Sequence, residues 1–198
     1  MAYQYTQQLI ELAMTYEQYR AHIRTVLATA PIDAAAARLR YYTAANAVLM
    51  DEYDESYRVL PELSEALASA PPTTWLVISE GWCGDAAFNL PLMYVAEKAM
   101  PAAIKLRVVL RDSNLPLIDA NLTDGGRAIP KLVVLNEALE PVGHWGPRPE
   151  PLQDLMTAWK NEGLELKQLI PKVHGWYDAD RTRSLQHELT RMIKHYSL

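Results

Sequence analysis

The chain has 198 residues, of which 49% are hydrophobic and 22% charged, and its formal net charge is -5 at pH 7. This length and composition are typical of one globular domain, or of one domain with a sizeable extension. The mild acidity argues against a nucleic-acid-binding surface, which needs a basic stripe, and no run approaches the ~18 apolar residues of a membrane span.

The chain holds a single cysteine, Cys83, which excludes an internal disulfide framework and fits a reducing compartment. The first residues, MAYQYTQQLIELAMTY, lack the basic region, the continuous apolar stretch and the small-residue cleavage site of a signal peptide. We therefore expect a cytoplasmic protein that binds neither nucleic acid nor a membrane.

The N-terminal part is predicted to be helical. Asp33 fits the N-cap of a second helix over residues 34–53, and Pro61 fits the first turn of a third helix over residues 61–69. The segment APPTT at 70–74 is expected to be a linker, because two prolines cannot continue a helix. The first helix is indicated by apolar residues at steps of three and four: Leu9, Leu12, Ala13, Tyr16, Tyr19, Ile23, Val26 and Leu27.

From residue 74 the hydrophobic pattern changes to short apolar runs that are typical of buried strands. We predict strands at residues 74–79, 104–112, 131–135 and 141–145. Helices are predicted at 85–101 and 151–163, with a short helix or turn at 114–122, and Pro91 should bend the first helix or mark its start. This order of elements is that of a small α/β sandwich. In the tail, a last helix face is formed by Leu185, Leu189, Met192, Ile193 and Tyr196.

Cys83 lies in the stretch WLVISEGWCGDAAFNLP, at the turn between the first predicted strand and the helix that follows it. A thiol at the first turn of a helix is close to free backbone N–H groups and to the positive end of the helix dipole, and both favour the thiolate. We therefore expect a thiol pKa below the ordinary value of about 8.5. The alternative is that Cys83 is a small, inert, buried side chain.

Two short motifs resemble the thioredoxin family. Trp82-Cys83-Gly84 matches the start of the family's Trp-Cys-Gly-Pro-Cys turn, and Ile129-Pro130 matches its Ile-Pro pair, whose proline is cis. Gly146 lies where the family usually has a glycine that lines the substrate groove. The resemblance covers about Trp75 to Gly163 and implies an α/β thioredoxin-like fold, with a central mixed sheet flanked by helices. It also divides the chain into an N-terminal helical extension (1–70), a thioredoxin-like domain (71–163) and a C-terminal helical tail that packs on the domain (164–198).

This sequence departs from the family at two positions. Ala86 replaces the second cysteine of the turn, and Val77 stands where thioredoxins have a buried aspartate. The resemblance therefore implies a monothiol disulfide oxidoreductase without a resolving cysteine, in which Cys83 attacks a protein disulfide or a mixed disulfide. Such a protein needs no cofactor, although glutathione or another low-molecular-weight thiol could serve as its reductant.

Several residues around the two motifs are candidates for the groove that receives the substrate or partner. Asp85 would raise the pKa of Cys83 if the side chains approached, but residues two apart on a helix point apart, so we expect a role at the helix N-terminus. Arg148 could stabilise a thiolate or bind a substrate carboxylate, or it could be a surface residue with no role. Trp82 could pack over the thiol or belong to the core. The predicted site consists of Cys83 as the catalytic residue and a groove formed by Trp82, Gly84, Asp85, Ile129, Pro130 and Arg148.

Two other functions stay open at this point. The fold could serve as a redox-inactive binding or adaptor module that recruits a protein partner near Pro130 and Arg148. Oxidation could also join two copies of the chain through a Cys83–Cys83 disulfide. The five histidines show no metal-ligand spacing with Cys83, so we expect no metal site.

Overall fold

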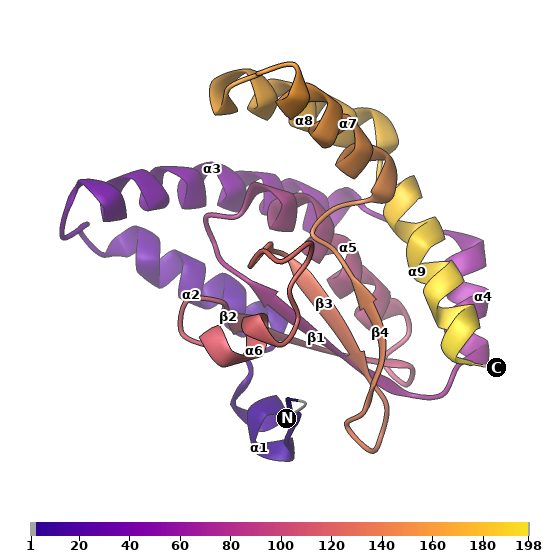
Figure 1. Ribbon diagram of the computed structural model, residues 1–198. Helices are drawn as coiled ribbons and strands as arrows, with labels where there is room; N and C mark the ends of the chain where they lie inside the picture. The colour runs from indigo at the N-terminus through magenta and orange to yellow at the C-terminus, as the bar shows by residue number, and fades with distance from the viewer. Residues whose placement is uncertain (1–2, 198) are drawn as a thin grey trace.

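The structure is a computed structural model that describes residues 3–197. The start of the predicted segment 1–70 and the end of the predicted segment 164–198 therefore lie outside the described residues. Four strands form one sheet, and helices surround it (Figure 1). The elements are, in chain order, α1 (Gln7–Leu12), α2 (Tyr16–Ala28), α3 (Ala34–Ser56), α4 (Pro61–Ser69), β1 (Thr73–Ser79), α5 (Gly84–Ala99), β2 (Ile104–Leu110), α6 (Leu115–Asp119), β3 (Lys131–Leu135), β4 (Pro141–Trp145), α7 (Glu150–Asn161), α8 (Leu166–Asp180) and α9 (Arg183–Tyr196).

The sheet has the strand order β2-β1-β3-β4, in which β1 is parallel to β2 and antiparallel to β3, and β3 is antiparallel to β4. The central strands are apolar and buried, because helices exclude water from the sheet. β3 and β4 span the predicted residues, whereas β1 begins at Thr73, inside the predicted linker. The predicted mixed sheet flanked by helices is therefore confirmed. The division of the chain at residues 71 and 163 stays a prediction.

The first predicted helix is wrong in one respect, because the chain breaks it into α1 and α2. Between them Met14 forms an isolated antiparallel bridge with Val108 of β2, through backbone hydrogen bonds of 2.9 and 2.8 Å. Thr15 then caps α2. Leu12, which the pattern placed on the apolar face, is 77% exposed. Periodicity misses this break because the apolar residues on either side of it keep the spacing of a helix.

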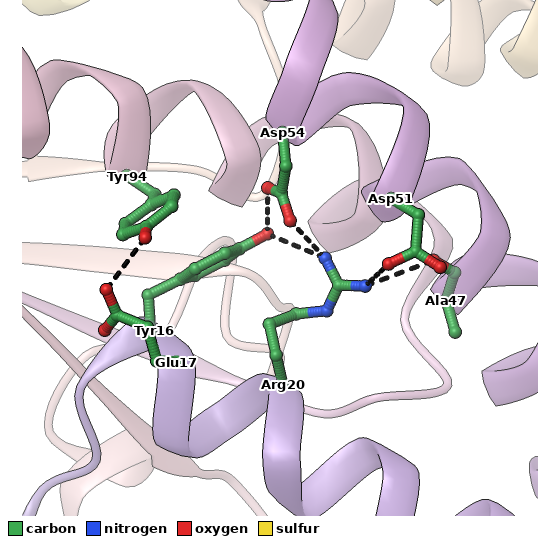
Figure 2. A network of polar contacts seen from close by, with 7 residues as sticks. All are labelled: Tyr16, Glu17, Arg20, Ala47, Asp51, Asp54 and Tyr94. Carbon is green, nitrogen blue, oxygen red and sulfur yellow. Dashed lines mark hydrogen bonds and ion pairs between the residues drawn. The ribbon is translucent and has the colours of Figure 1, made fainter.

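A buried arginine on α2 pairs with α3, and its neighbour Tyr16 contacts α5 (Figure 2). Arg20 is 7% exposed, and its guanidinium group donates to the carboxylates of Asp51 and Asp54 on α3. The Tyr16 hydroxyl donates to Asp54 at 2.7 Å, and the Tyr16 ring stacks on Tyr94 of α5 with 4.4 Å between the ring centroids. α2 is thus held against α3 and against the helix that follows the Cys83 turn.

We predict that Arg20→Met lowers the free energy of unfolding by about 3 kcal/mol, because breaking a buried ion pair leaves a carboxylate without its partner. The Asp54 side chain is 23% exposed, which keeps the loss at the low end of the range for such pairs. Arg24→Met is the control, since Arg24 is exposed on the same helix, and it should change the free energy by less than about 0.5 kcal/mol. Urea denaturation measures both changes. Equal losses in the two variants would show that the ion pairs do not hold α2 in place.

The C-terminal part, predicted only as a helical tail, contains a helix for which the sequence analysis gave no bounds. α8 contains Pro171 and Gly175, which both disfavour a helix interior and so hide its pattern. It lies beside α7 (Figure 1). α9 follows after Arg181 and Thr182, both of which have positive φ, and packs against α4 and β4 (Figure 1). Its predicted apolar face is confirmed in the core by Leu185, Leu189 and Ile193.

Pro91 lies inside α5 and does not mark its start. α5 begins at Gly84, directly after Cys83, and its residues from Ala86 to Met93 are buried. The predicted start at residue 85 is therefore within one residue of the observed one. The proline therefore leaves the start of the helix at the Cys83 turn.

Candidate functional site

The Cys83 turn joins the end of β1 to the start of α5. The backbone N–H of Cys83 donates to the carbonyl oxygen of Glu80 at 3.0 Å, which closes the turn. Cys83 is the N-cap of α5, and its own carbonyl oxygen accepts from the N–H of Ala87 at 3.3 Å. The thiol therefore stands at the N-terminus of a helix, as the sequence indicates.

The turn faces the peptide bond between Ile129 and Pro130, which is cis. The Cys83 thiol donates to the carbonyl oxygen of Ile129, with 3.2 Å between sulfur and oxygen. Gly146 packs against the same segment: it has φ of +111°, and a Cβ there would lie 2.2 Å from the carbonyl oxygen of Pro130. The two motifs that carried the resemblance, separated by 46 residues, are therefore in direct contact.

The surroundings of Cys83 oppose a thiolate, which contradicts the low pKa expected at a helix N-terminus. Cys83 is 7% exposed, and this burial raises the pKa of the thiol to about 12, with the Asp85 carboxylate adding to the rise. The backbone N–H of Ala86 and the guanidinium group of Arg148 lower the pKa but do not offset burial. Removal from water destabilises a thiolate more than hydrogen bonds from the N–H groups of one helix turn stabilise it. In this conformation Cys83 is a protonated thiol.

Asp85 points toward the protein and not into solvent, and its charge is the second cause, after burial, of the raised pKa of Cys83. Arg148 donates to Asp85 Oδ2 through Nη2 at 2.5 Å and through Nε at 3.2 Å. The Tyr177 hydroxyl donates to Asp85 Oδ1 at 2.9 Å and accepts from the Asn89 amide at 3.0 Å. The side chains of Asp85 and Arg148 are only 11% and 15% exposed. These four residues, Asp85, Asn89, Arg148 and Tyr177, are called the Asp85 cluster below.

The Asp85 cluster connects α8 to the start of α5. The Tyr177 ring stacks on Phe88 with 4.2 Å between the ring centroids, and the Tyr53 hydroxyl of α3 donates to Asp178 at 3.1 Å. Burial, followed by the charge of Asp85, raises the pKa of Tyr177 well above its ordinary value. Its hydroxyl therefore keeps its proton and continues to donate to Asp85.

The remaining residues of the predicted groove, Trp82, Gly84 and Arg148, make different contacts and do not touch one another in any hydrogen bond or ring contact described below. Trp82 is partly buried against the core, and the guanidinium group of Arg111 lies 4.8 Å above its ring. Gly84 is the first residue of α5, with open space where a Cβ would point. Arg148 is bound to Asp85 and to Gln153, so it is neither a free surface residue nor an empty carboxylate site.

Two residues of the site were missed by the sequence analysis. Tyr177 is 92 residues away from Asp85, in the predicted helical tail, and no local pattern connects the two. Asn89 is 1% exposed and lies in an otherwise apolar part of α5. A buried amide needs hydrogen-bond partners, so this asparagine was the one signal in the sequence that α5 contacts a polar group.

Within residues 3–197 there is no group of three or more His, Cys, Asp and Glu side chains that could hold a metal ion. None of the helices described over the same range is both long enough and apolar enough to cross a bilayer.

Comparisons with known proteins agree with a thioredoxin-like fold. The family model described as thioredoxin matches residues 33–160, so the match also takes in α3 and α4, upstream of residue 71. A crystal structure of a protein of unknown function from Pseudomonas aeruginosa shares 18% identity, with a TM-score of 0.62, over 96% of this chain and 98% of that one. An HIV epitope scaffold shares 17% identity, with a TM-score of 0.62, over 94% and 96%. These two structures support the fold alone. No curated protein matches the chain.

Proposed function

The chain belongs to the thioredoxin family, and on that premise we propose that it is a monothiol thiol–disulfide exchange protein that works through Cys83. The observation that carries this proposal is the position of the sulfur. It stands at the N-cap of α5, 3.2 Å from the carbonyl oxygen of Ile129 and next to the cis bond of Pro130. Cys83 is also the only thiol of the chain, so any exchange must begin there.

The proposed cycle has two steps. In the first, the Cys83 thiol loses its proton and the thiolate attacks one sulfur of a disulfide R–S–S–R′, so that the mixed disulfide Cys83–S–S–R forms and R′–S⁻ leaves and takes up a proton. In the second, an external thiol R″–SH loses its proton and attacks the sulfur of R, which releases R–S–S–R″. The Cys83 thiolate that leaves takes up the proton. Over the cycle the protein is neither oxidised nor reduced, and R″–S replaces R′–S on the substrate.

The second step needs an external thiol because Ala86 occupies the position of the resolving cysteine. Ala86 is 1% exposed and carries no group that could release the product. We propose a protein disulfide or mixed disulfide as the substrate and glutathione, or a similar low-molecular-weight thiol, as the reductant. A reducing compartment such as the cytoplasm would supply that thiol.

We propose that the thiol is latent in the described conformation. The proton on Cys83 is held by the Ile129 carbonyl, and burial with the charge of Asp85 keeps the pKa of Cys83 high. The thiolate is the reactive species, so exchange is slow until the surroundings of the turn change. If Asp85 were displaced, the charge of Arg148, which lowers the pKa of Cys83, would no longer be opposed by that carboxylate and would favour the thiolate.

The burial of Cys83 also favours a second candidate function, a binding module that has kept the fold without redox work. A thiol that is 7% exposed with a pKa of about 12 behaves as an apolar side chain at neutral pH. In that case the surface near Pro130 and Arg148 would recruit a protein partner, and Cys83 would have only a packing role.

Incubation with oxidised glutathione separates the two functions. The exchange protein is expected to gain the mass of one glutathione, slowly near neutral pH and faster as the pH rises, and to lose it on addition of reduced glutathione. The matched control is Cys83→Ser, which should gain no mass. If the folded wild type gains none while the urea-unfolded chain does, the binding module becomes the better account.

A further inference from the structure

A cavity of about 380 Å³ lies between β3, β4, the β4–α7 loop and α9. Its lining includes Thr123, Lys131 and His144, together with Trp145, Pro147 and Met192. A volume of this size is enough for a small organic molecule. The cavity is open to solvent, and polar groups and apolar surface share its lining.

Lys131 is the unusual member of this lining. It is 8% exposed, and its ammonium group donates to the Thr123 hydroxyl at 3.0 Å. Among residues 3–197 no carboxylate oxygen lies within 4.0 Å of its Nζ atom, since the ion pairs of that range do not include Lys131. Buried lysines are almost always paired with an anion, because an ammonium group loses much of its solvation on burial. One neutral hydroxyl does not replace that partner.

The other charged residues around the cavity already have partners or lie in solvent. Glu188 accepts from the indole N–H of Trp145 at 2.6 Å and from the backbone N–H of Glu150 at 2.8 Å. Arg148 is bound to Asp85. Arg191 and Glu150 are 3.7 Å apart at their nearest atoms, and both side chains are more than 70% exposed. Lys131 is therefore the buried charge of this cavity without an ion-pair partner within 4.0 Å in the part of the chain described, and the Asp124 carboxylate acts on it only from farther away.

We infer that the cavity is a binding site for a small carboxylate with an apolar body, whose carboxylate group is received by Lys131 and Thr123. Trp145, Pro147 and Met192 supply the apolar wall for the rest of the molecule. A single ammonium group and a hydroxyl suit one carboxylate, whereas phosphate sites usually add arginine forks or several backbone N–H groups. The inference does not rest on exchange at Cys83, because it concerns a charge and a cavity that the thiol chemistry does not use.

The test uses sodium benzoate as the probe, followed by the amide signals of the ¹⁵N-labelled full chain. Benzoate is expected to shift the signals of Lys131, His144 and Trp145 with a dissociation constant of about 1 mM, as a ligand of this size allows. Benzyl alcohol, which has the same ring without the charge, should shift them far less. Lys131→Met should weaken benzoate binding at least about tenfold.

Lys105→Met is the matched control, because Lys105 also lies on a strand but is exposed, and it should bind benzoate like the wild type. Binding that survives Lys131→Met, equal binding of benzyl alcohol, or no shift of these signals at all would each overturn the inference. If Lys131→Met does not fold, the comparison of benzoate with benzyl alcohol on the wild type still decides it. Failure of this site would leave the proposed exchange untouched, since benzoate carries no sulfur.

Discussion

Asp85→Asn is expected to speed the alkylation of Cys83 by iodoacetamide about tenfold at about pH 8. The Asp85 carboxylate is the main charge that raises the pKa of the thiol, after burial, and Arg148 acts against it. Asparagine keeps the shape of the side chain but removes the negative charge. Its one amide oxygen can still accept from Arg148, and its NH2 group can donate to the Tyr177 hydroxyl in place of accepting from it. The guanidinium group then remains beside the turn without its counterion, and the thiolate becomes more stable.

The control for this prediction is Asp119→Asn. Asp119 also binds an arginine, Arg127, through two hydrogen bonds of 2.6 and 2.8 Å. Asp119 ends α6, Arg127 lies in the loop before β3, and both side chains are about half exposed. Its loss should leave the alkylation rate of Cys83 unchanged. Intact mass against time measures the rate in each protein, and circular dichroism checks that each is folded. A rate that is unchanged or slower in Asp85→Asn would show that the charge of Asp85 does not keep the thiol protonated.

Gly146→Ala is expected to destabilise the protein by about 4 kcal/mol or more, a large part of the stability of a domain. Two separate causes act at this residue. Its φ of +111° is a conformation that side chains with a Cβ rarely adopt, and the new Cβ would meet the carbonyl oxygen of Pro130 at 2.2 Å. That neighbour is backbone, so neither a rotamer change nor a small shift relieves the clash. The segment that faces Cys83 would have to move.

Gly175→Ala provides the contrast, because the added Cβ at Gly175 would meet no atom within 4 Å and the residue lies inside α8. This variant should be up to about 1 kcal/mol more stable, as alanine is the better helix former. Thermal unfolding of both variants gives the comparison. A melting temperature for Gly146→Ala within a few degrees of the wild type would mean that the loop after β4 is free to adjust, and that it does not fix the position of Pro130.

Much of the sheet could be predicted, because buried strands appear in the sequence as short apolar runs. β3 and β4 span the residues expected from short apolar runs bounded by turns. Asp33 caps α3 as expected, with its carboxylate accepting from the N–H of Ala36 at 2.7 Å. The contact of Cys83 with Ile129 also agrees with the resemblance, since both motifs lie at the ends of strands that pair in the sheet.

The electrostatics of the site could not be predicted in the same way. Helix spacing correctly separates Asp85 from Cys83 along the chain, but it does not say how far each side chain is removed from water. The partners of Asp85 come from the loop after β4 and from α8, 63 and 92 residues away. A low thiol pKa follows from the helix N-terminus only when the sulfur stays solvated, and the fold buries it.

The most direct test of this account is a pH titration of Cys83 in the folded protein. A chain labelled with ¹³C at the cysteine Cβ gives one cysteine signal, because Cys83 is the only cysteine. With the pKa of the thiol raised to about 12 by burial and by Asp85, the signal is expected to keep the position of a protonated thiol from neutral pH to about pH 10. A titration with a pKa at or below the ordinary value of about 8.5 would contradict the account. Cys83 would then be exposed to water, or its thiolate would be stabilised by its surroundings.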